Sequence, residues 1–414
     1  MNNIRIYLLF LLGCLLDVVS ASSQIADTVS SPVIHRIGLD FSPGYVLPTN
    51  ALYRYRSDEV SLLKQSASVH LKYGFQFSPS TRLGRMYPNC YQGIGIAYQT
   101  FFDSDNYGEP LLVYAFQHAR ICRISNRLGL DYEWDFGLST GWKPYHKEHN
   151  PLNKVVGSKM NAYINLNFLF DWHLNKDWSL DCGVGLTHFS NGNTHSPNAG
   201  VNIVSARIGV SRVFDSHDCL GRRASLSGAS ESLKSSKSSV SSKTSEQMSP
   251  HISYDLVVYG ATRIKAIIEQ QYLVPGVFGV VGLNFSPMFN FNRYFKAGVS
   301  ADVQWDESAN IQYHEAGVDE EGYKRFYWPP FREQFSVGLS LRGELVMPFF
   351  SVNIGFGHNL LYQGSDLDGF YQMAVLKTSL TRNLYLHVGY QLKEFHTPKN
   401  LMLGFGYRFH NKRK

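Results

Sequence analysis

Apolar and polar residues alternate along much of this chain, and this period of two constrains the fold more than any other feature. In residues 128–138, "LGLDYEWDFGL", every second residue is apolar or aromatic, and those between are acidic or glycine. Because side chains alternate across a β-strand, the segment predicts a strand with one apolar face and one polar face. The same pattern recurs in residues 164–172, 335–345 and 401–409.

The alternation alone leaves two fold classes open, because a soluble β-sandwich also turns one polar face to water. Alternating segments of about ten residues, aromatic residues at strand ends and an export signal together favour an antiparallel transmembrane β-barrel, apolar outside and polar inside. A closed barrel satisfies every backbone hydrogen bond, as a lipid environment demands. No later stretch holds about 18 consecutive apolar residues, so the sequence predicts no transmembrane helix.

The first residues have the pattern of a secretory signal peptide. Arg5 precedes an apolar run, and Val19-Ser20-Ala21 suits cleavage after Ala21, so residues 1–21 are predicted to be removed on export. A lipoprotein signal ending at Cys14 is an alternative, although the apolar run continues past that cysteine. With a barrel after the signal, we expect the outer membrane of a Gram-negative cell as the location.

Counting the alternating runs predicts roughly sixteen strands, about half before residue 216 and half after residue 250. We expect one large barrel of about 16 strands, because two separate barrels would need two closures; two 8-strand units are the alternative. Residues 33–215 and 251–410 would supply the strands. Residues 216–250 between them are rich in serine and lysine, which predicts a disordered periplasmic segment.

Connection lengths indicate how such a barrel is oriented. Tight turns are predicted at residues 175–177, 347–350 and 381–383, and longer polar segments separate other strands. Barrels of this kind have short periplasmic turns and longer external loops. If the N-terminus is periplasmic, all three tight turns fall on the periplasmic side.

The stretch "THFSNGNTHSPNAGVN", residues 187–202, combines residues used in nucleophilic catalysis. His188 and Ser190 continue the apolar, lipid-facing phase of the strand before them. If the next strand pairs across the loop as a hairpin, Asn202 lies opposite His188, about 4.5–5.5 Å away between Cβ atoms. The pattern therefore predicts Ser190 as nucleophile, His188 as base and Asn202 as the group that orients the imidazole.

An ordinary polar loop explains the same residues without chemistry. A His-x-Ser pattern arises by chance in a chain with 15 histidines, and His251-Ile252-Ser253 is a second instance without a partner. External barrel loops are also commonly rich in asparagine, serine and glycine. Spacing alone leaves both interpretations open.

The stretch "HFSNGNTHSPNAGVN" resembles the active-site segment of the PagL lipid A 3-O-deacylase family, grouped with acyloxyacyl-hydrolase-like proteins. The residues that carry the resemblance are His188, Ser190, Asn191, Pro197, Asn198 and Gly200. The resemblance implies an outer-membrane barrel of eight strands that removes an ester-linked acyl chain from lipid A with a Ser-His-Glu triad. It also implies that Asn198 and the amides of Asn191 and Gly192 form an oxyanion hole.

The chain departs from that family in two respects. Position 202 is asparagine where the family has glutamate, and the chain is about twice the family's length. Asparagine can orient a histidine, as it does in Cys-His-Asn proteases, but it stabilises the imidazolium less. The resemblance covers roughly residues 33–215, and residues 251–410 look like the second half of longer family members.

We therefore expect an outer-membrane ester hydrolase acting on lipid A of lipopolysaccharide, without metal or other cofactor. The alternative is a non-catalytic porin-like or binding barrel in which the motif is a remnant. Lys143, Lys147 and Lys154 lie in a predicted external loop and are candidates to hold the lipid A phosphates, although a solvated loop explains them as well. The formal net charge of +6 forms no dense basic stripe, so no nucleic acid is expected as a partner.

Overall fold

The structure is a computed structural model of the chain. It describes residues 33–48, 64–151, 153, 155–214, 250–267, 272–320, 324–347, 350–395 and 397–410. The predicted signal peptide and nearly all of the predicted disordered segment 216–250 lie outside the described residues.

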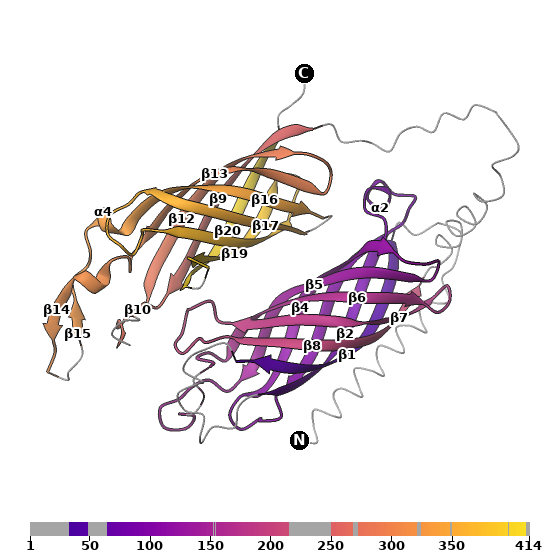
Figure 1. The fold of residues 1–414 in the computed structure, drawn as a ribbon, viewed down its shortest axis with the longest axis horizontal. Coiled ribbons are helices and arrows are strands. Elements are labelled where there is room, and N and C mark those ends of the chain that lie inside the picture. The colour runs from indigo at the N-terminus through magenta and orange to yellow at the C-terminus, as the bar shows by residue number, and fades with distance from the viewer. Residues whose placement is uncertain are drawn as a thin grey trace, which may run out of the picture.

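The first eight strands form one closed antiparallel barrel (Figure 1). Each strand pairs with its neighbours in the chain, and β1 also pairs with β8, which removes both sheet edges. The strands are β1 (Val33–Leu47), β2 (Gln65–Phe77), β3 (Cys90–Thr100), β4 (Gly108–Arg123), β5 (Leu128–Trp142), β6 (Met160–His173), β7 (Trp178–Ser190) and β8 (Val201–Phe214).

A second closed antiparallel barrel of eight strands follows, with β9 pairing both β12 and β20. Its strands are β9 (His251–Arg263), β12 (Phe278–Asn290), β13 (Phe295–Asp306), β16 (Phe335–Val346), β17 (Phe350–Leu361), β18 (Phe370–Ser379), β19 (Leu384–Lys393) and β20 (Thr397–His410). The connections hold α2 (Arg82–Met86), a 3-10 turn (Ile311–Tyr313), α4 (Phe331–Gln334) and two small hairpins, β10 (Ala266–Ile267) with β11 (Tyr272–Leu273) and β14 (Glu315–Val318) with β15 (Lys324–Phe326).

The single barrel of about 16 strands that we favoured is therefore wrong, and the alternative of two 8-strand units fits the structure. The period of two predicts how many strands form and which face each residue joins, but it does not encode where a sheet closes. Closure depends on pairing between distant strands. Here β8 returns to β1 along a ladder from His35 opposite Phe214 to Leu47 opposite Asn202, so no edge is left to receive β9.

The alternation places apolar residues outside each barrel and polar residues inside. In β7, Leu186 is 52% exposed whereas Asp181 is 3% exposed. In β5, Asp131 and Glu133 are buried in the lumen while Tyr132 between them faces outward. The faces predicted from the sequence are thus the faces observed.

Connections alternate between the two ends of each barrel. The connections β6–β7, β16–β17 and β18–β19, where tight turns were predicted, each follow an even-numbered strand of their own barrel and so lie at one end, here called the turn end. The longer connections β5–β6 and β13–β16 lie at the opposite end, here called the loop end. Within the described residues, no helix is long and apolar enough to cross a membrane.

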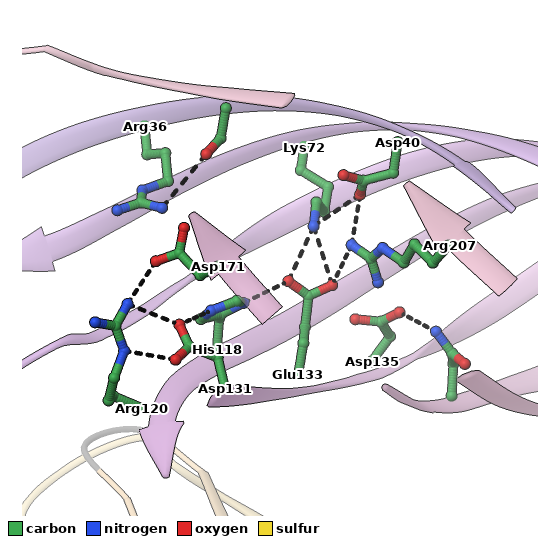
Figure 2. Close-up of polar contacts among 12 residues, drawn as sticks. Arg36, Asp40, Lys72, His118, Arg120, Asp131, Glu133, Asp135, Asp171 and Arg207 are labelled. Atoms are coloured by element: carbon green, nitrogen blue, oxygen red, sulfur yellow. Dashed lines mark hydrogen bonds and ion pairs between the residues drawn. The ribbon is translucent and has the colours of Figure 1, made fainter. Parts of the chain in front are cut away.

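The lumen of the first barrel is filled by a network of ion pairs centred on Glu133 (Figure 2). Its carboxylate lies 2.9 Å from Lys72 Nζ, 2.7 Å from Arg207 Nη2 and 3.1 Å from His118 Nδ1. Further members are Asp40, Arg120, Asp131 and Asp171. An interior of eight strands is just wide enough for side chains, so this lumen is a packed core and not an aqueous channel.

The second barrel has a similar lumen. Glu344 and Asp255 share two cations, with Lys377 Nζ 2.5 Å from Glu344 and 2.9 Å from Asp255, and Arg408 2.7 Å from Asp255 and 3.0 Å from Glu344. All four side chains are mostly or fully buried. This barrel is also filled by its own side chains.

The two barrels lie side by side (Figure 1), and contacts join them at both the turn end and the loop end; this line of contacts is here called the seam. At the turn end, the hydroxyl of Tyr294 donates to the carbonyl of Met86 at 3.1 Å. Phe350, at the turn-end start of β17, also contacts Trp134 of β5, and the two rings meet edge to face with centroids 5.2 Å apart. At the loop end, the backbone groups of Asn193 and Ile264 are joined by a hydrogen bond of 3.1 Å. Like ends of the two barrels therefore lie together.

Candidate active site

His188 and Asn202 lie opposite each other on β7 and β8, at the loop end of the first barrel. The distance between His188 Nδ1 and Asn202 Oδ1 is 2.7 Å. Because an amide oxygen can only accept, the imidazole donates from Nδ1, which leaves Nε2 to accept a proton. The pairing predicted from the hairpin register is the pairing observed.

Ser190 lies two residues beyond His188 on the same outward face and is partly buried. Its Oγ accepts hydrogen bonds from the backbone N–H of Gly192 at 3.1 Å and from Asn198 Nδ2 at 3.0 Å. Asn198 Oδ1 in turn accepts from the backbone N–H of Asn191 at 3.2 Å. The structure thus gathers around Ser190 the groups that sequence resemblance assigned to an oxyanion hole.

In this structure the Ser190 hydroxyl bonds to the loop and not to His188; among the described residues no hydrogen bond joins the two side chains. Residues two apart on a strand are separated by roughly 6.6 Å, within reach of an imidazole and a hydroxyl that turn toward each other. Catalytic hydrogen bonds are often long or misaligned before substrate binds. The separation is compatible with a nucleophile and its base.

The loop that carries these donors is fixed by neighbouring backbone. Asn198 forms a β-bridge with Val156 from the β5–β6 connection, and Ala199 N donates to Val155 O at 3.1 Å. Gly200 has φ +71°, and a Cβ there would lie 3.1 Å from Cε1 of the His188 ring. A glycine is therefore required where the loop turns past the imidazole.

The second barrel contacts the same loop, which sequence analysis missed. A Cβ on Gly192, whose φ is +65°, would lie 2.5 Å from Cγ of Leu401. The Asn193 side chain also donates to the carbonyl of Ile264 at 3.2 Å. No signal in the sequence links these positions, because the contact exists only once both barrels have closed and packed.

The lysines predicted to hold the lipid A phosphates are not among the residues that hydrogen-bond to Ser190. Lys143 follows β5 at the loop end, is exposed, and has its Nζ 3.7 Å from Asp105. Lys147 is exposed in the same connection, and Lys154 lies outside the described residues. An exposed ion pair at such a distance stabilises little, so Lys143 is available to another anion.

This arrangement brings together the residue types that acyl transfer uses. A serine hydroxyl, an imidazole with a fixed tautomer and two N–H donors converge on the outward surface near one end of a barrel. These are the parts of a serine esterase. Their position on the apolar face, and not in the lumen, means that a substrate would approach from the side.

Comparison with protein-family models gives two matches, one in the second half of the first barrel and one over nearly all of the second barrel. Residues 126–211 match the model for lipid A 3-O-deacylase (PagL), and residues 252–411 match the model for the acyloxyacyl hydrolase C-terminal domain. The chain belongs to the PagL-like family. The PagL match includes β7, most of β8 and the loop between them, so it includes every residue of the candidate site in this first barrel.

Solved outer-membrane proteins show only distant likeness to this PagL-like chain. Neisserial surface protein A is 9% identical, covering 45% of this chain and 100% of its own, with a TM-score of 0.30. An outer membrane channel from Pseudomonas putida F1 is 12% identical, covering 93% of this chain and 100% of its own, with a TM-score of 0.19. None of the curated proteins compared with the sequence matches it.

Proposed function

We propose that this protein is an outer-membrane esterase that removes an ester-linked acyl chain from lipid A. The observation that carries the proposal is the joint placement of Ser190, of His188 held by Asn202, and of two N–H donors on the outward face of the first barrel. Membership of a family whose model is named for lipid A 3-O-deacylase supports the substrate class. Polar groups on a lipid-facing surface are costly unless they bind something there.

The first step would begin with rotation of the Ser190 side chain toward His188. Nε2 takes the hydroxyl proton as Oγ attacks the acyl carbonyl carbon, and the bond from that carbon to the sugar oxygen then breaks. His188 returns its proton to the sugar oxygen, which leaves as an alcohol. Water, deprotonated by the same nitrogen, then releases the fatty acid from Ser190.

The same rotation prepares the oxyanion hole. Gly192 N and Asn198 Nδ2 lie 3.1 and 3.0 Å from the present position of Ser190 Oγ. When Oγ turns to His188, it vacates a point that both donors face at the distance suited to an oxyanion. The carbonyl oxygen of the substrate would occupy that point and gain both hydrogen bonds as its negative charge develops.

Asn202 would act as a positioning residue. Its Oδ1 holds the imidazole by Nδ1, which fixes the tautomer, but a neutral amide gives less stabilisation than a carboxylate once His188 is protonated. We therefore expect slower chemistry than a glutamate at this position would give.

The neutral side chain at 202 also favours a second candidate, a binding barrel without catalysis in which the motif is a remnant. The porin-like form of that candidate is disfavoured, because the ion-pair networks around Glu133 and Glu344 occupy the lumens. The absence of a carboxylate at position 202 would then remove activity, while the loop around Ser190 and its hydrogen bonds persist.

Further parts of the proposal concern location and substrate contacts. Export through a cleaved signal at residues 1–21 would deliver the chain to the outer membrane, with the loop end facing outward. Lys143, Lys147 and Lys154 would contact the lipid A phosphates from the β5–β6 connection beside β6. No cofactor and no nucleic acid takes part.

The decisive experiment compares lipid A from cells that express the parent, the Ser190→Ala variant or neither protein, by mass spectrometry. We expect loss of one acyl chain with the parent alone. Folding of the variant is checked by heat-modifiable migration on gels, which one hydroxyl on the surface should not affect. Identical lipid A in all three samples would favour the non-catalytic barrel.

A further inference from the structure

An apolar groove of about 530 Å³ lies between the two barrels. One wall is the outward face of β6, with Ile164, Leu166 and Phe168. The other wall is the outward face of β16 and β17, with Leu345, Val352 and Ile354. The groove is thus bounded by surfaces that both have the composition of a lipid-facing barrel.

The register of β6 and β7 places the groove beside the candidate site. Ile164 pairs with His188, and Ala162, the next outward residue toward the loop end, pairs with Ser190. Directly paired residues have Cβ atoms about 4.5–5.5 Å apart. A chain that leaves the groove at Ile164 lies one strand spacing from His188, and if it continues over Ala162 toward the loop end it comes equally close to Ser190.

The second barrel also touches the loop that holds the oxyanion donors. Leu401 packs against Gly192, and Ile264 is hydrogen-bonded to Asn193 through both backbone and side chain. The seam therefore places the groove wall and the catalytic loop in contact with the same partner barrel.

We infer that this groove binds the acyl chain that Ser190 releases, so that the second barrel forms part of the active site. This inference rests on the proposed esterase function. The walls are almost entirely apolar, which suits a hydrocarbon chain and excludes the phosphorylated sugar. From Ile164 to Phe168 the groove extends roughly 13 Å along β6, close to the ~15 Å depth of one bilayer leaflet.

Gly343 offers a direct way to fill the groove. It lines the groove from β16, and a Cβ added there would meet no heavy atom within 4 Å. Gly343→Phe therefore adds bulk to the groove without a clash inside its own barrel. The control is Val69→Phe on the outward face of β2, which is 46% exposed and lies in the first barrel away from β5 and β6.

The experiment measures kcat/KM of the full-length parent and variants in detergent on a series of esters of rising acyl length. Gly343→Phe should lower turnover of long-chain esters at least tenfold more than turnover of short-chain esters, while Val69→Phe matches the parent on both. Ile354→Ala, which widens the same groove, should shift preference toward longer chains. Heat-modifiable migration verifies that each barrel folds.

The outcomes separate this inference from the proposed function. If the parent hydrolyses esters in a Ser190-dependent manner but Gly343→Phe and Ile354→Ala leave chain-length preference unchanged, the groove does not bind the acyl chain. If no Ser190-dependent hydrolysis occurs with any ester, the proposed function itself fails, and the groove inference fails with it.

Discussion

His188 Nδ1 lies 2.7 Å from Asn202 Oδ1 across the β7–β8 pair of the first barrel. This single hydrogen bond fixes which ring nitrogen carries the proton and leaves Nε2 as the nitrogen that can accept one. The relationship makes position 202 the most informative place to test whether the first barrel is an enzyme.

Replacing Asn202 with leucine should abolish most activity without unfolding the barrel. Leucine keeps the approximate volume and suits an outward-facing position, but it cannot accept a hydrogen bond from His188. Loss of imidazole orientation in such catalytic groups lowers kcat on the order of 10²–10⁴-fold. Turnover of purified lipid A in detergent measures the effect, and an Asn202→Leu protein as fast as the parent would assign Asn202 no orienting role.

Replacing Asn202 with glutamate should match or raise the parent's activity. The carboxylate keeps an acceptor at the same point and adds negative charge next to the imidazolium that forms during attack. The assay is again turnover of lipid A. If Asn202→Glu is active and the parent is not, the natural protein is a lapsed enzyme rather than a working esterase.

Gly192→Ala should lower kcat about 10²–10³-fold, the effect of losing one oxyanion donor. Alanine is strained at φ +65° and would collide with Leu401, so the Gly192 N–H must move away from Ser190. Adding Leu401→Ala removes the collision but not the backbone strain and should restore part of the activity. Gly317→Ala is the control, because Gly317 also has a positive φ, +109°, but a Cβ there meets nothing within 4 Å. Equal losses of kcat in Gly192→Ala and Gly317→Ala would refute a local effect on the oxyanion donor.

Lys143→Ala combined with Lys147→Ala should raise KM for lipid A by up to about 30-fold and leave kcat nearly unchanged. Both side chains are exposed at the loop end, and each lysine near an anionic lipid surface contributes about 1 kcal/mol. The comparison substrate is an uncharged ester of the same acyl chain, for which the double variant should have the parent's KM. An equal rise for both substrates would point to a loop displacement instead of phosphate binding.

The sequence predicted the local geometry of the site well because that geometry depends on short-range rules. Period two placed His188 and Ser190 outward, and hairpin pairing placed Asn202 opposite His188. The same rules predicted about half the strands before residue 216 and half after residue 250.

What could not be predicted depends on contacts between distant parts of the chain. The choice between one barrel and two is decided by β8 meeting β1, and no periodic pattern encodes that choice. The contact of Leu401 with Gly192 requires both closures and then the packing of two apolar surfaces. The hydrogen bonds of Ser190 with Gly192 and Asn198 also depend on loop conformation that alternation does not describe.

Two neighbouring acidic residues on the lumen face of β5, Glu133 and Asp135, should affect stability differently when each is replaced by its amide. Glu133→Gln removes the carboxylate shared by Lys72, Arg207 and His118. These cations keep only Asp40 and Asp131 as partners, so the substitution should lower the unfolding free energy by up to roughly 3–5 kcal/mol, the cost of leaving a buried charge unpaired. Asp135 makes no ion pair within 4 Å among the described residues. Its carboxylate accepts hydrogen bonds from Tyr163 and Asn165 through one oxygen, and its other oxygen has no hydrogen-bond partner.

Asp135→Asn is therefore a matched control: the same isosteric loss of charge, on the same strand and the same lumen face. It should leave stability unchanged or raise it, because it removes a buried charge that no cation pairs. The measurement is the temperature or denaturant concentration at which each purified barrel loses its heat-modifiable folded form. Since Glu133 points into the lumen and Ser190 points outward, folded Glu133→Gln protein should keep its esterase activity well below its unfolding temperature. Equal destabilisation by both substitutions would mean that the lumen network contributes through packing alone, and not through the pairing of Glu133 with its three cations.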